Sequence, residues 1–308
     1  MVPKNRKVVV ASIVLLPGLG HCAGIFTGFH SFGDSLTDSG NVYTLSGGTI
    51  GYPGGRFSNG PTWAEQLATD FLGFPSHPPL ILGGTNHAWG GARTGNFIPP
   101  LGESQLPPSL KQQVDFFLED GGSFSSSDLV SLWGGANDLI DSIESNLGIA
   151  NPAASAANIG NALDSVLSAG AETVLILNLP DLGVTPAFRG GPSEALASAW
   201  TVDFNAALAA QVEARRVPGL VLLETDIFAL GKDFQDNPSA YSLDNLFDPV
   251  FPDQTLDPST SAFWDEVHPT ETVHGLFARE AAANLGIPEP SSLLLMLAAP
   301  LLFMGRRR

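Results

Sequence analysis

Residues 25–41 read IFTGFHSFGDSLTDSGN, and the change of character within this stretch decides the fold. Its first part, Ile25–Phe32, is apolar and aromatic enough to be a strand. The strand runs into Gly33-Asp34-Ser35, where glycine permits a tight turn. Ser35 then lies just past the carboxyl end of a strand, where open α/β sheets bind their ligands. Taken alone, the triplet is equally consistent with an Asx or Ser turn that only closes the strand.

Beyond this stretch, short apolar runs alternate with helical patterns. The other expected strands are Leu129–Trp133, Thr173–Leu177 and Leu220–Leu223, with a further one near Leu80–Leu82 or just before Gly90. The expected helices are Pro61–Phe71 with its proline in the first turn, Leu110–Leu118, Ala153–Ser168, Glu194–Arg216 and Thr270–Leu285. This alternation predicts a single α/β domain over residues 25–287, with a parallel sheet and helices on both faces.

One long stretch does not fit the alternation. Thr225–Phe263 is rich in Asp, Pro, Asn and Phe, which favours a loop-dominated excursion with short helices. Loops longer than ~12–15 residues are often lids or binding segments. Whether this excursion acts as a lid is left open by the sequence.

The composition is that of a folded, acidic protein. Of 308 residues, 44% are hydrophobic and 15% charged, which indicates a core-forming chain. Residues 25–287 hold 30 of the 31 acidic residues and 8 of the 14 basic ones, a net charge of −22. Such a body repels phosphate backbones, so we expect no nucleic-acid partner. The single cysteine, Cys22, allows neither an intrachain disulfide nor a Cys-based metal site.

Residues 1–24 have the layout of a secretory signal peptide. Basic residues at positions 4, 6 and 7 precede the apolar run 8–19, and the small residues Ala23 and Gly24 follow. The apolar run is shorter than the ~20 residues that span a bilayer. Two alternatives stay open: an uncleaved N-terminal anchor, and a lipoprotein box at Leu19-Gly20-His21-Cys22.

Residues 288–308 form a second targeting pattern. Pro288-Glu289-Pro290 is followed by the apolar run Leu293–Met304 and by Arg306-Arg307-Arg308, whose charges favour the cytoplasmic side of a membrane. In this order the three parts resemble the PEP-CTERM sorting tail of exported bacterial proteins. The resemblance implies transient membrane association, cleavage by an exosortase-type enzyme, and release to the cell envelope or extracellular matrix. A plain C-terminal anchor is the alternative.

Two blocks contain groups able to bind an oxyanion. Residues 86–95 contain Gly90-Gly91, whose backbone can approach a ligand closely and present an N–H. Residues 133–139 follow a strand and contain Asn137, whose side chain is an N–H donor. Asparagine at such a position is also common as a helix cap.

A further block, residues 265–270, contains Asp265 and His268, three positions apart. In a turn the carboxylate can bind one ring nitrogen and leave the other free as a base, although Pro269 also suits a helix start. A parallel sheet gathers its strand ends at one edge, so the blocks supply a hydroxyl, a base oriented by an acid, and oxyanion donors. These are the requirements of acyl transfer.

The four blocks, in this order from Ser35 to His268, resemble those of the GDSL, or SGNH, hydrolase family. Residues 57–63 are similar to a segment of its larger lipase-like branch. The resemblance implies a three-layer α/β/α sandwich, flavodoxin-like, with a mostly parallel five-stranded sheet. It also implies that Ser35 is the nucleophile, His268 the general base and acid, and Asp265 the residue that orients His268.

The same resemblance implies an oxyanion hole made by the backbone N–H of Ser35, that of Gly91 rather than Gly90, and the Asn137 side chain. Two positions depart from the family pattern. His87 stands where this branch usually has Tyr or Phe, which puts the local shape of the pocket in question. Ala136 replaces a frequent glycine before the Asn-Asp pair.

The remaining histidines give no sign of a metal site. We expect His30 to be packed in the first strand or exposed at its edge, His77 to lie in a proline-rich loop, and His274 to pack on the last helix. None has a second ligand at metal spacing, and no His-Glu-x-x-His occurs. The sequence therefore predicts neither a metal nor an organic cofactor.

The sequence thus predicts an exported serine esterase or lipase-like hydrolase that cleaves carboxylic esters of lipids or acylated carbohydrates. The expected partners are this substrate, signal peptidase and the exosortase-type enzyme. Two alternatives remain: an acetyl esterase acting on extracellular polysaccharide, and a non-catalytic surface or matrix protein that retains the fold.

Overall fold

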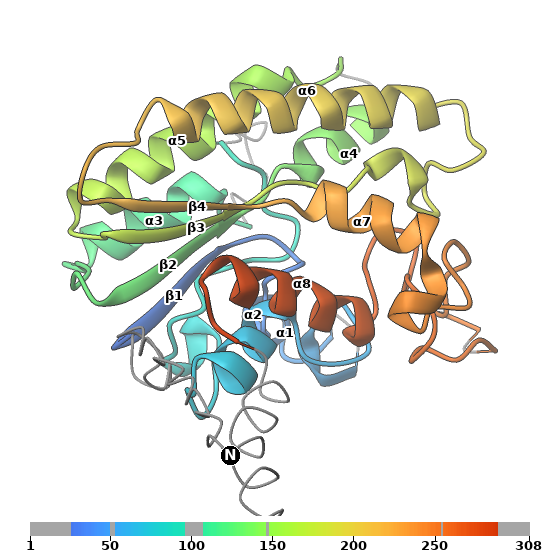
Figure 1. Ribbon diagram of the computed structural model, residues 1–308, viewed down its shortest axis with the longest axis horizontal. Helices are drawn as coiled ribbons and strands as arrows, with labels where there is room; N and C mark the ends of the chain where they lie inside the picture. The colour runs from blue at the N-terminus through green and yellow to red at the C-terminus, as the bar shows by residue number, and fades with distance from the viewer. Residues whose placement is uncertain (1–25, 50–52, 96–106, 146–147, 254, 289–308) are drawn as a thin grey trace, which may run out of the picture.

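The computed structural model describes residues 26–49, 53–95, 107–145, 148–253 and 255–288 (Figure 1). The expected signal peptide and all but the first residue of the expected sorting tail therefore lie outside the described residues. Within these ranges, no helix is both long enough and apolar enough to cross a bilayer.

Four parallel strands form the sheet. They are β1 (Gly28–Gly33), β2 (Asp128–Trp133), β3 (Thr173–Leu177) and β4 (Val221–Thr225), paired in the order β1-β2-β3-β4. Successive side chains of a strand point to opposite faces. In β2, Val130 and Leu132 enter one hydrophobic core, while Leu129 and Trp133 enter the other. Both faces of the sheet are apolar, so both must be covered.

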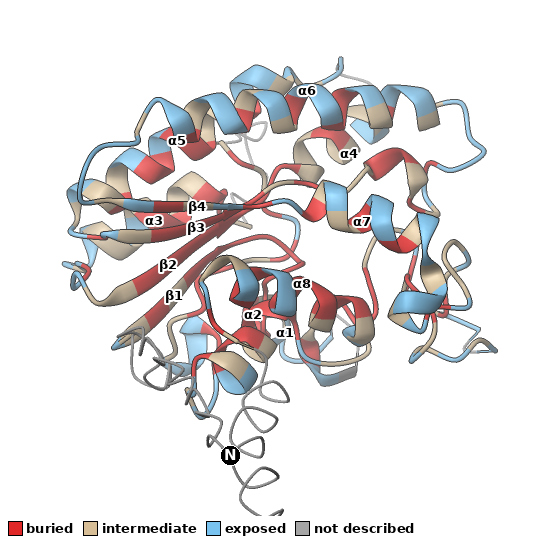
Figure 2. Ribbon diagram, in the orientation of Figure 1, coloured by how far each residue is buried: buried red, intermediate tan, exposed pale blue. Residues whose placement is uncertain are grey.

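Helices cover the two faces of the sheet (Figure 1). One layer consists of α3 (Leu110–Glu119), α4 (Ala136–Ser145), α5 (Pro152–Ser168) and α6 (Glu194–Glu213). The other consists of α2 (Trp63–Gln66), its π-helical continuation η2 (Leu67–Phe71), α7 (Ile227–Asp236) and α8 (Glu271–Asn284). Figure 2 shows the buried residues concentrated in the strands and on the helix faces turned toward them. The three-layer α/β/α class predicted from the sequence is confirmed.

Side-chain caps fix where several helices begin. Thr62 accepts the backbone N–H of Glu65, and Glu65 in turn binds the Thr62 N–H, which makes a capping box at the start of α2. Pro61 therefore precedes the helix, and the expectation of proline in its first turn is wrong. The other side-chain caps are Ser109 for α3, Asn151 for α5, Asp226 for α7 and Thr270 for α8.

The described residues contain four strands, not the five expected. Leu80–Leu82, one candidate for the fifth, is the 3-10 helix η3. At the other candidate position, Asn86 makes an isolated parallel bridge to Ser31 of β1. Residues 85–89 run along β1, with the His87 N–H bound to the Ser31 carbonyl at 2.8 Å, but the next β1 donor, the Gly33 N–H, is bound to Gln113 Oε1 at 2.9 Å, so no regular strand forms.

Two helices were not expected from the sequence, namely α1 (Asn41–Leu45) and α4. The excursion Thr225–Phe263 begins with the ten-residue α7 and the short η5 (Pro238–Tyr241), and only its later part is loop. For the other expected strands and helices, the observed ends differ from the predicted ends by at most three residues.

Two buried histidines, His77 and His87, pack on opposite faces of β1, whose own His30 is half-buried. His87 stacks on Phe32 with ring centroids 4.5 Å apart, and its Nε2 lies 3.5 Å from His30 Nδ1. His77, expected in a loop, is buried there and its Nε2 lies 2.7 Å from Ser31 Oγ. Burial lowers the pKa of His77 and of His87 to about 3. His87 thus fills the place of an aromatic side chain as a neutral ring.

Replacing His87 with phenylalanine should weaken the dependence of stability on pH. The folded state keeps this ring neutral, whereas the unfolded chain binds a proton below its ordinary pKa of 6.5. The stabilisation is therefore complete above pH 6.5 and is lost as the pH falls toward 3. In His87→Phe the slope of unfolding free energy against pH should fall by up to about 1.4 kcal/mol per pH unit within this window. Urea unfolding of both proteins across it measures the difference.

Groups other than His87 titrate in both proteins, so the difference between the two pH dependences of the unfolding free energy is the contribution of the His87 ring. At neutral pH the variant should be at least as stable as the parent. The new ring can stack on Phe32, and the substitution removes a buried Nδ1 that has no hydrogen-bond partner among the described residues. Parallel stability curves would show that His87 takes up no proton on unfolding.

Candidate active site

The turn after β1 presents Ser35 at the carboxyl edge of the sheet. Gly33 ends the strand, and a Cβ atom at this position would lie 2.4 Å from the Trp133 carbonyl oxygen of β2, so only glycine fits. The Asp38 N–H donates to the Asp34 carbonyl at 2.9 Å and closes the turn. Ser35 is 8% exposed, so its hydroxyl can be reached from one side only.

Ser35, His268 and Asp265 form a continuous hydrogen-bonded chain. His268 Nε2 lies 2.8 Å from Ser35 Oγ, and His268 Nδ1 lies 2.8 Å from Asp265 Oδ2. Asp265 Oδ1 accepts the backbone N–H groups of Val267 and His268 at 2.9 and 2.8 Å, which fixes the carboxylate. Residues 233 positions apart in the chain thus meet in the arrangement that the sequence predicts.

The loop that carries His268 is held at both of its sides. Trp264 donates its backbone N–H to the His268 carbonyl at 2.8 Å. Ser58 Oγ donates to the Pro269 carbonyl at 2.9 Å, and Thr270 caps α8 directly afterwards. The imidazole is therefore positioned by a helix start on one side and by a tight turn on the other.

Of the two glycines at 90 and 91, the first has its N–H occupied and the second lines the cavity. The Gly90 N–H is bound to Asp38 Oδ2 at 2.9 Å. Gly91 has φ +79, the left-handed region that favours glycine, and lines the same cavity as Ser35. This arrangement supports the choice of Gly91 over Gly90.

Asn137 is the second residue of α4 and not its cap. Its Nδ2 donates to the Ala92 carbonyl at 2.9 Å, which uses one of the two amide hydrogens and links α4 to the Gly91 loop. Asn137 also lines the cavity beside Ser35. All five residues named from the sequence therefore border one site.

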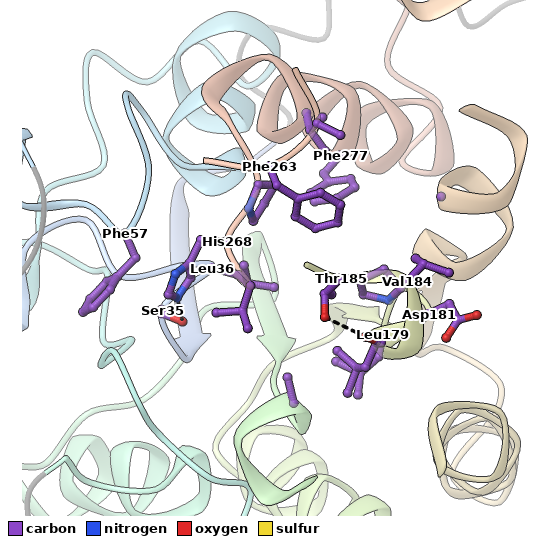
Figure 3. Close-up of a pocket in the computed structure, with 18 of the residues that line it drawn as sticks. Ser35, Leu36, Phe57, Leu179, Asp181, Val184, Thr185, Phe263, His268 and Phe277 are labelled. Carbon is purple, nitrogen blue, oxygen red and sulfur yellow. Dashed lines mark hydrogen bonds between the residues drawn. The ribbon is translucent and has the colours of Figure 1, made fainter. Parts of the chain in front are cut away.

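A mostly apolar cavity of about 240 Å³ opens from this site. Figure 3 shows Ser35 and His268 at one end, with Phe263, Phe277, Leu179 and Val184 extending away from them. The apolar side chains that line it are Leu36, Phe57, Ala136, Ile140, Leu179, Pro180, Leu182, Val184, Phe234, Leu246, Ala262, Phe263, Val267, Pro269, Val273 and Phe277. The excursion Thr225–Phe263 contributes six of the lining residues, namely Gly231, Phe234, Gln235, Leu246, Ala262 and Phe263.

Comparison with known proteins decides the family. The sequence profile of the GDSL-like lipase/acylhydrolase family matches residues 31–281. The chain belongs to this family. Membership confirms the predicted enzyme class, a carboxylic ester hydrolase of the serine type.

Relatives of this GDSL hydrolase differ in length. The chain is 29% identical to the phosphatidylcholine-sterol acyltransferase of Aeromonas hydrophila, covering 82% of this chain and 88% of that protein. It is 30% identical to esterase EstA of Pseudomonas aeruginosa, over 85% of this chain but only 47% of the esterase. A putative GDSL-like lipase from Parabacteroides merdae has the same fold, with a TM-score of 0.50, 14% identity, and coverage of 85% of this chain and 96% of that one.

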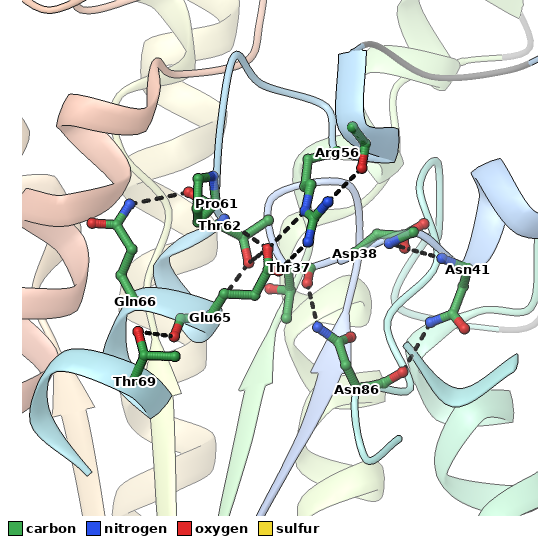
Figure 4. A network of polar contacts seen from close by, with 12 residues as sticks. Thr37, Asp38, Asn41, Arg56, Pro61, Thr62, Glu65, Gln66, Thr69 and Asn86 are labelled. Carbon is green, nitrogen blue, oxygen red and sulfur yellow. Dashed lines mark hydrogen bonds and ion pairs between the residues drawn. The ribbon is translucent and has the colours of Figure 1, made fainter. Parts of the chain in front are cut away.

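A polar network that the sequence did not reveal joins the Ser35 turn of this GDSL hydrolase to the loop of Gly90 and Gly91. Figure 4 shows its contacts around Asp38, Asn41 and Asn86. Asp38 is fully buried and accepts the N–H groups of Gly40 and Gly90 at 2.8 and 2.9 Å. Asn86 donates to the Thr37 carbonyl at 2.7 Å, while Asn41 donates to the Asn86 carbonyl at 2.9 Å. The Asp-x-Gly-Asn run starting at position 38 signals a local turn. No sequence pattern near position 38 indicates that Gly90 is a partner of Asp38.

Burial also perturbs the carboxyl group next to the nucleophile. Asp34 has its pKa raised to about 7 by burial, and the Leu36 N–H and the nearby His268 oppose this shift. Across the described ranges, no three His, Cys, Asp or Glu side chains converge in a way that could hold a metal ion.

Proposed function

We propose that this GDSL hydrolase is an exported esterase of the lipase type, in which Ser35 attacks esters of apolar acyl groups. The observation that carries the proposal is the hydrogen-bonded chain Ser35–His268–Asp265 at the end of an apolar cavity. A hydroxyl, a base and an orienting acid within hydrogen-bond reach are the parts of an activated nucleophile.

In the proposed mechanism, His268 Nε2 takes the proton of Ser35 as Oγ attacks the ester carbonyl. The negative charge on the tetrahedral intermediate is stabilised by the N–H groups of Ser35 and Gly91 and by the Asn137 amide. His268 then protonates the leaving alcohol, and the acyl group stays on Ser35. Water, deprotonated by His268 Nε2, attacks the acyl carbonyl; the bond to Ser35 Oγ then breaks, Oγ takes the proton back from His268, and the carboxylic acid leaves. Asp265 holds the imidazole in the tautomer whose Nε2 can accept the proton.

The cavity favours a larger acyl group than acetyl. Its walls beyond Ser35 are apolar over most of their extent, and burying apolar surface is favourable by roughly 25 cal/mol per Å². An acetyl group would leave most of the cavity empty. For the same reason an acetyl esterase of extracellular polysaccharide is the weaker alternative. A non-catalytic role is weaker still, because it would not need the Ser35–His268 contact.

The proposal is tested with nitrophenyl esters of increasing acyl length, from acetyl through butyryl and octanoyl to hexadecanoyl. Each buried methylene contributes about 0.8 kcal/mol, so kcat/KM should rise at least about tenfold from acetyl to octanoyl. A maximum at acetyl would overturn the choice of acyl group and favour the polysaccharide esterase. Release of acetate from an isolated acetylated polymer would then be measured.

Export and transient membrane association are part of the proposal, and their support is in the sequence. Residues 1–24 have the basic, apolar and small-residue order of a signal peptide, and residues 288–308 have the order of a sorting tail. Both lie almost entirely outside the described residues. The termini of the mature protein, measured by mass spectrometry, decide whether signal peptidase and an exosortase-type enzyme act on it.

A further inference from the structure

A glycine occupies the interior of α7, where glycine is unfavourable. Gly231 is the fifth of the ten residues of Ile227–Asp236 and is buried. Glycine in a helix interior is less stable than alanine because it loses more backbone entropy on folding. A glycine at such a position therefore calls for a reason in the surrounding structure.

Neither the backbone nor the packing supplies that reason. Gly231 is not among the glycines with positive φ, so its backbone suits other residues. A Cβ atom at Gly231 would meet only Pro180 and Phe234 among the described residues, each at an ordinary contact distance of 3.9 Å. At Gly135, in contrast, φ is +127 and a Cβ atom would lie 2.5 Å from the Phe204 ring.

Because Gly231 has no side chain, the part of the cavity next to it stays open. Gly231 lines it together with Phe234, the next α7 residue on that side of the helix. Gly231 also adjoins Pro180, whose neighbours Leu179 and Asp181 lie away from Ser35 and His268 in Figure 3. A substituent at position 231 would therefore enter the cavity at a distance from the reacting atoms.

We propose that Gly231 determines the acyl-chain length that the enzyme accepts, because its lack of a side chain leaves room at α7 for the distal part of a long acyl group. This inference rests on the proposed function, in which the acyl group of the Ser35 ester occupies the cavity. The acyl chain would pass Leu36, Leu179 and Phe263 before it reaches α7.

The test is a graded series at position 231: Gly231→Ala, Gly231→Leu and Gly231→Phe. Excluding even one methylene from a hydrophobic pocket changes kcat/KM by about 10- to 200-fold. The Leu and Phe variants should therefore lose at least about tenfold in kcat/KM on dodecanoyl and hexadecanoyl nitrophenyl esters, with the Ala variant in between. Butyryl ester hydrolysis should stay within about twofold, since a short acyl group does not reach α7.

Ala229→Leu is the matched control, because it adds the same side chain to the same helix at an exposed position. It should leave both long- and short-chain rates unchanged. If Leu or Phe at position 231 unfolds α7, the test rests on Gly231→Ala. The added Cβ fits without a close contact, so this variant should stay folded, as measured by circular dichroism.

Two results would overturn the inference: unchanged long-chain rates in the Leu and Phe variants, or equal losses on long and short esters. Failure of the proposed function gives a different result. In that case the parent protein itself would show no gain in kcat/KM with acyl length, or no hydrolysis that depends on Ser35.

Discussion

Ser35→Ala is expected to lower kcat for ester hydrolysis by a factor on the order of 10⁶ while leaving the fold intact. The substitution removes the hydroxyl oxygen that lies 2.8 Å from His268 Nε2 in the chain Ser35–His268–Asp265. The turn itself does not need this hydroxyl, because it is closed by the Asp38 N–H bond to the Asp34 carbonyl. Nitrophenyl ester hydrolysis and circular dichroism of both proteins measure the two parts of the expectation.

Ser39→Ala is the matched control for that experiment. Ser39 belongs to the same turn and is 3% exposed, and its Oγ has no hydrogen-bond partner in the described part of the chain. It should keep the activity of the parent protein. Similar rates from Ser35→Ala and the parent would mean that Ser35 is not the nucleophile.

Asp265→Asn should lower kcat by a factor of about 10⁴. The amide oxygen can still accept the N–H groups of Val267 and His268, so the loop should keep its shape. The amide nitrogen would then face His268 Nδ1 and donate to it. That bond favours the tautomer with its proton on Nε2, which cannot accept the proton of Ser35. Steady-state kinetics with a nitrophenyl ester gives kcat and KM separately.

Asp248→Asn provides the comparison, because Asp248 is an exposed carboxylate in the preceding excursion, Thr225–Phe263. Its activity should equal that of the parent. If Asp265→Asn retained a kcat within tenfold of the parent, Asp265 would not control the tautomer of His268, and another group would have to do so.

The residues of the site could be found from the sequence because each lies in a short local pattern. Ser35 directly follows β1, and Asn137 follows β2 by a few residues. The carboxyl ends of parallel strands lie at one edge, so proximity along the sheet follows from the strand pattern alone. Asp265 and His268 are close in the chain and needed only a turn to meet.

The features that the sequence did not predict depend on contacts between residues that are far apart in the chain. Asp38 binds the N–H of Gly90, 52 positions later, and no local pattern encodes that contact. A fifth strand was expected near Leu80–Leu82 or just before Gly90. The first position is a 3-10 helix, and the second makes only isolated bridges because the Gly33 N–H is bound to the distant Gln113 side chain. The apolar cavity could not be foreseen either, because its walls come from α7, α8 and the turn after β3.

The separation of 233 positions between the nucleophile and its base has a consequence for the chain during its synthesis. Translation delivers the N-terminal part first. A nascent chain that has reached only β4 holds Ser35 and both oxyanion loops but lacks His268, which is supplied just before α8. Such a chain has no general base, so Ser35 cannot be activated in it. Ester hydrolysis becomes possible only when the last helix, α8, packs on α2, which ties the onset of activity to the completion of folding.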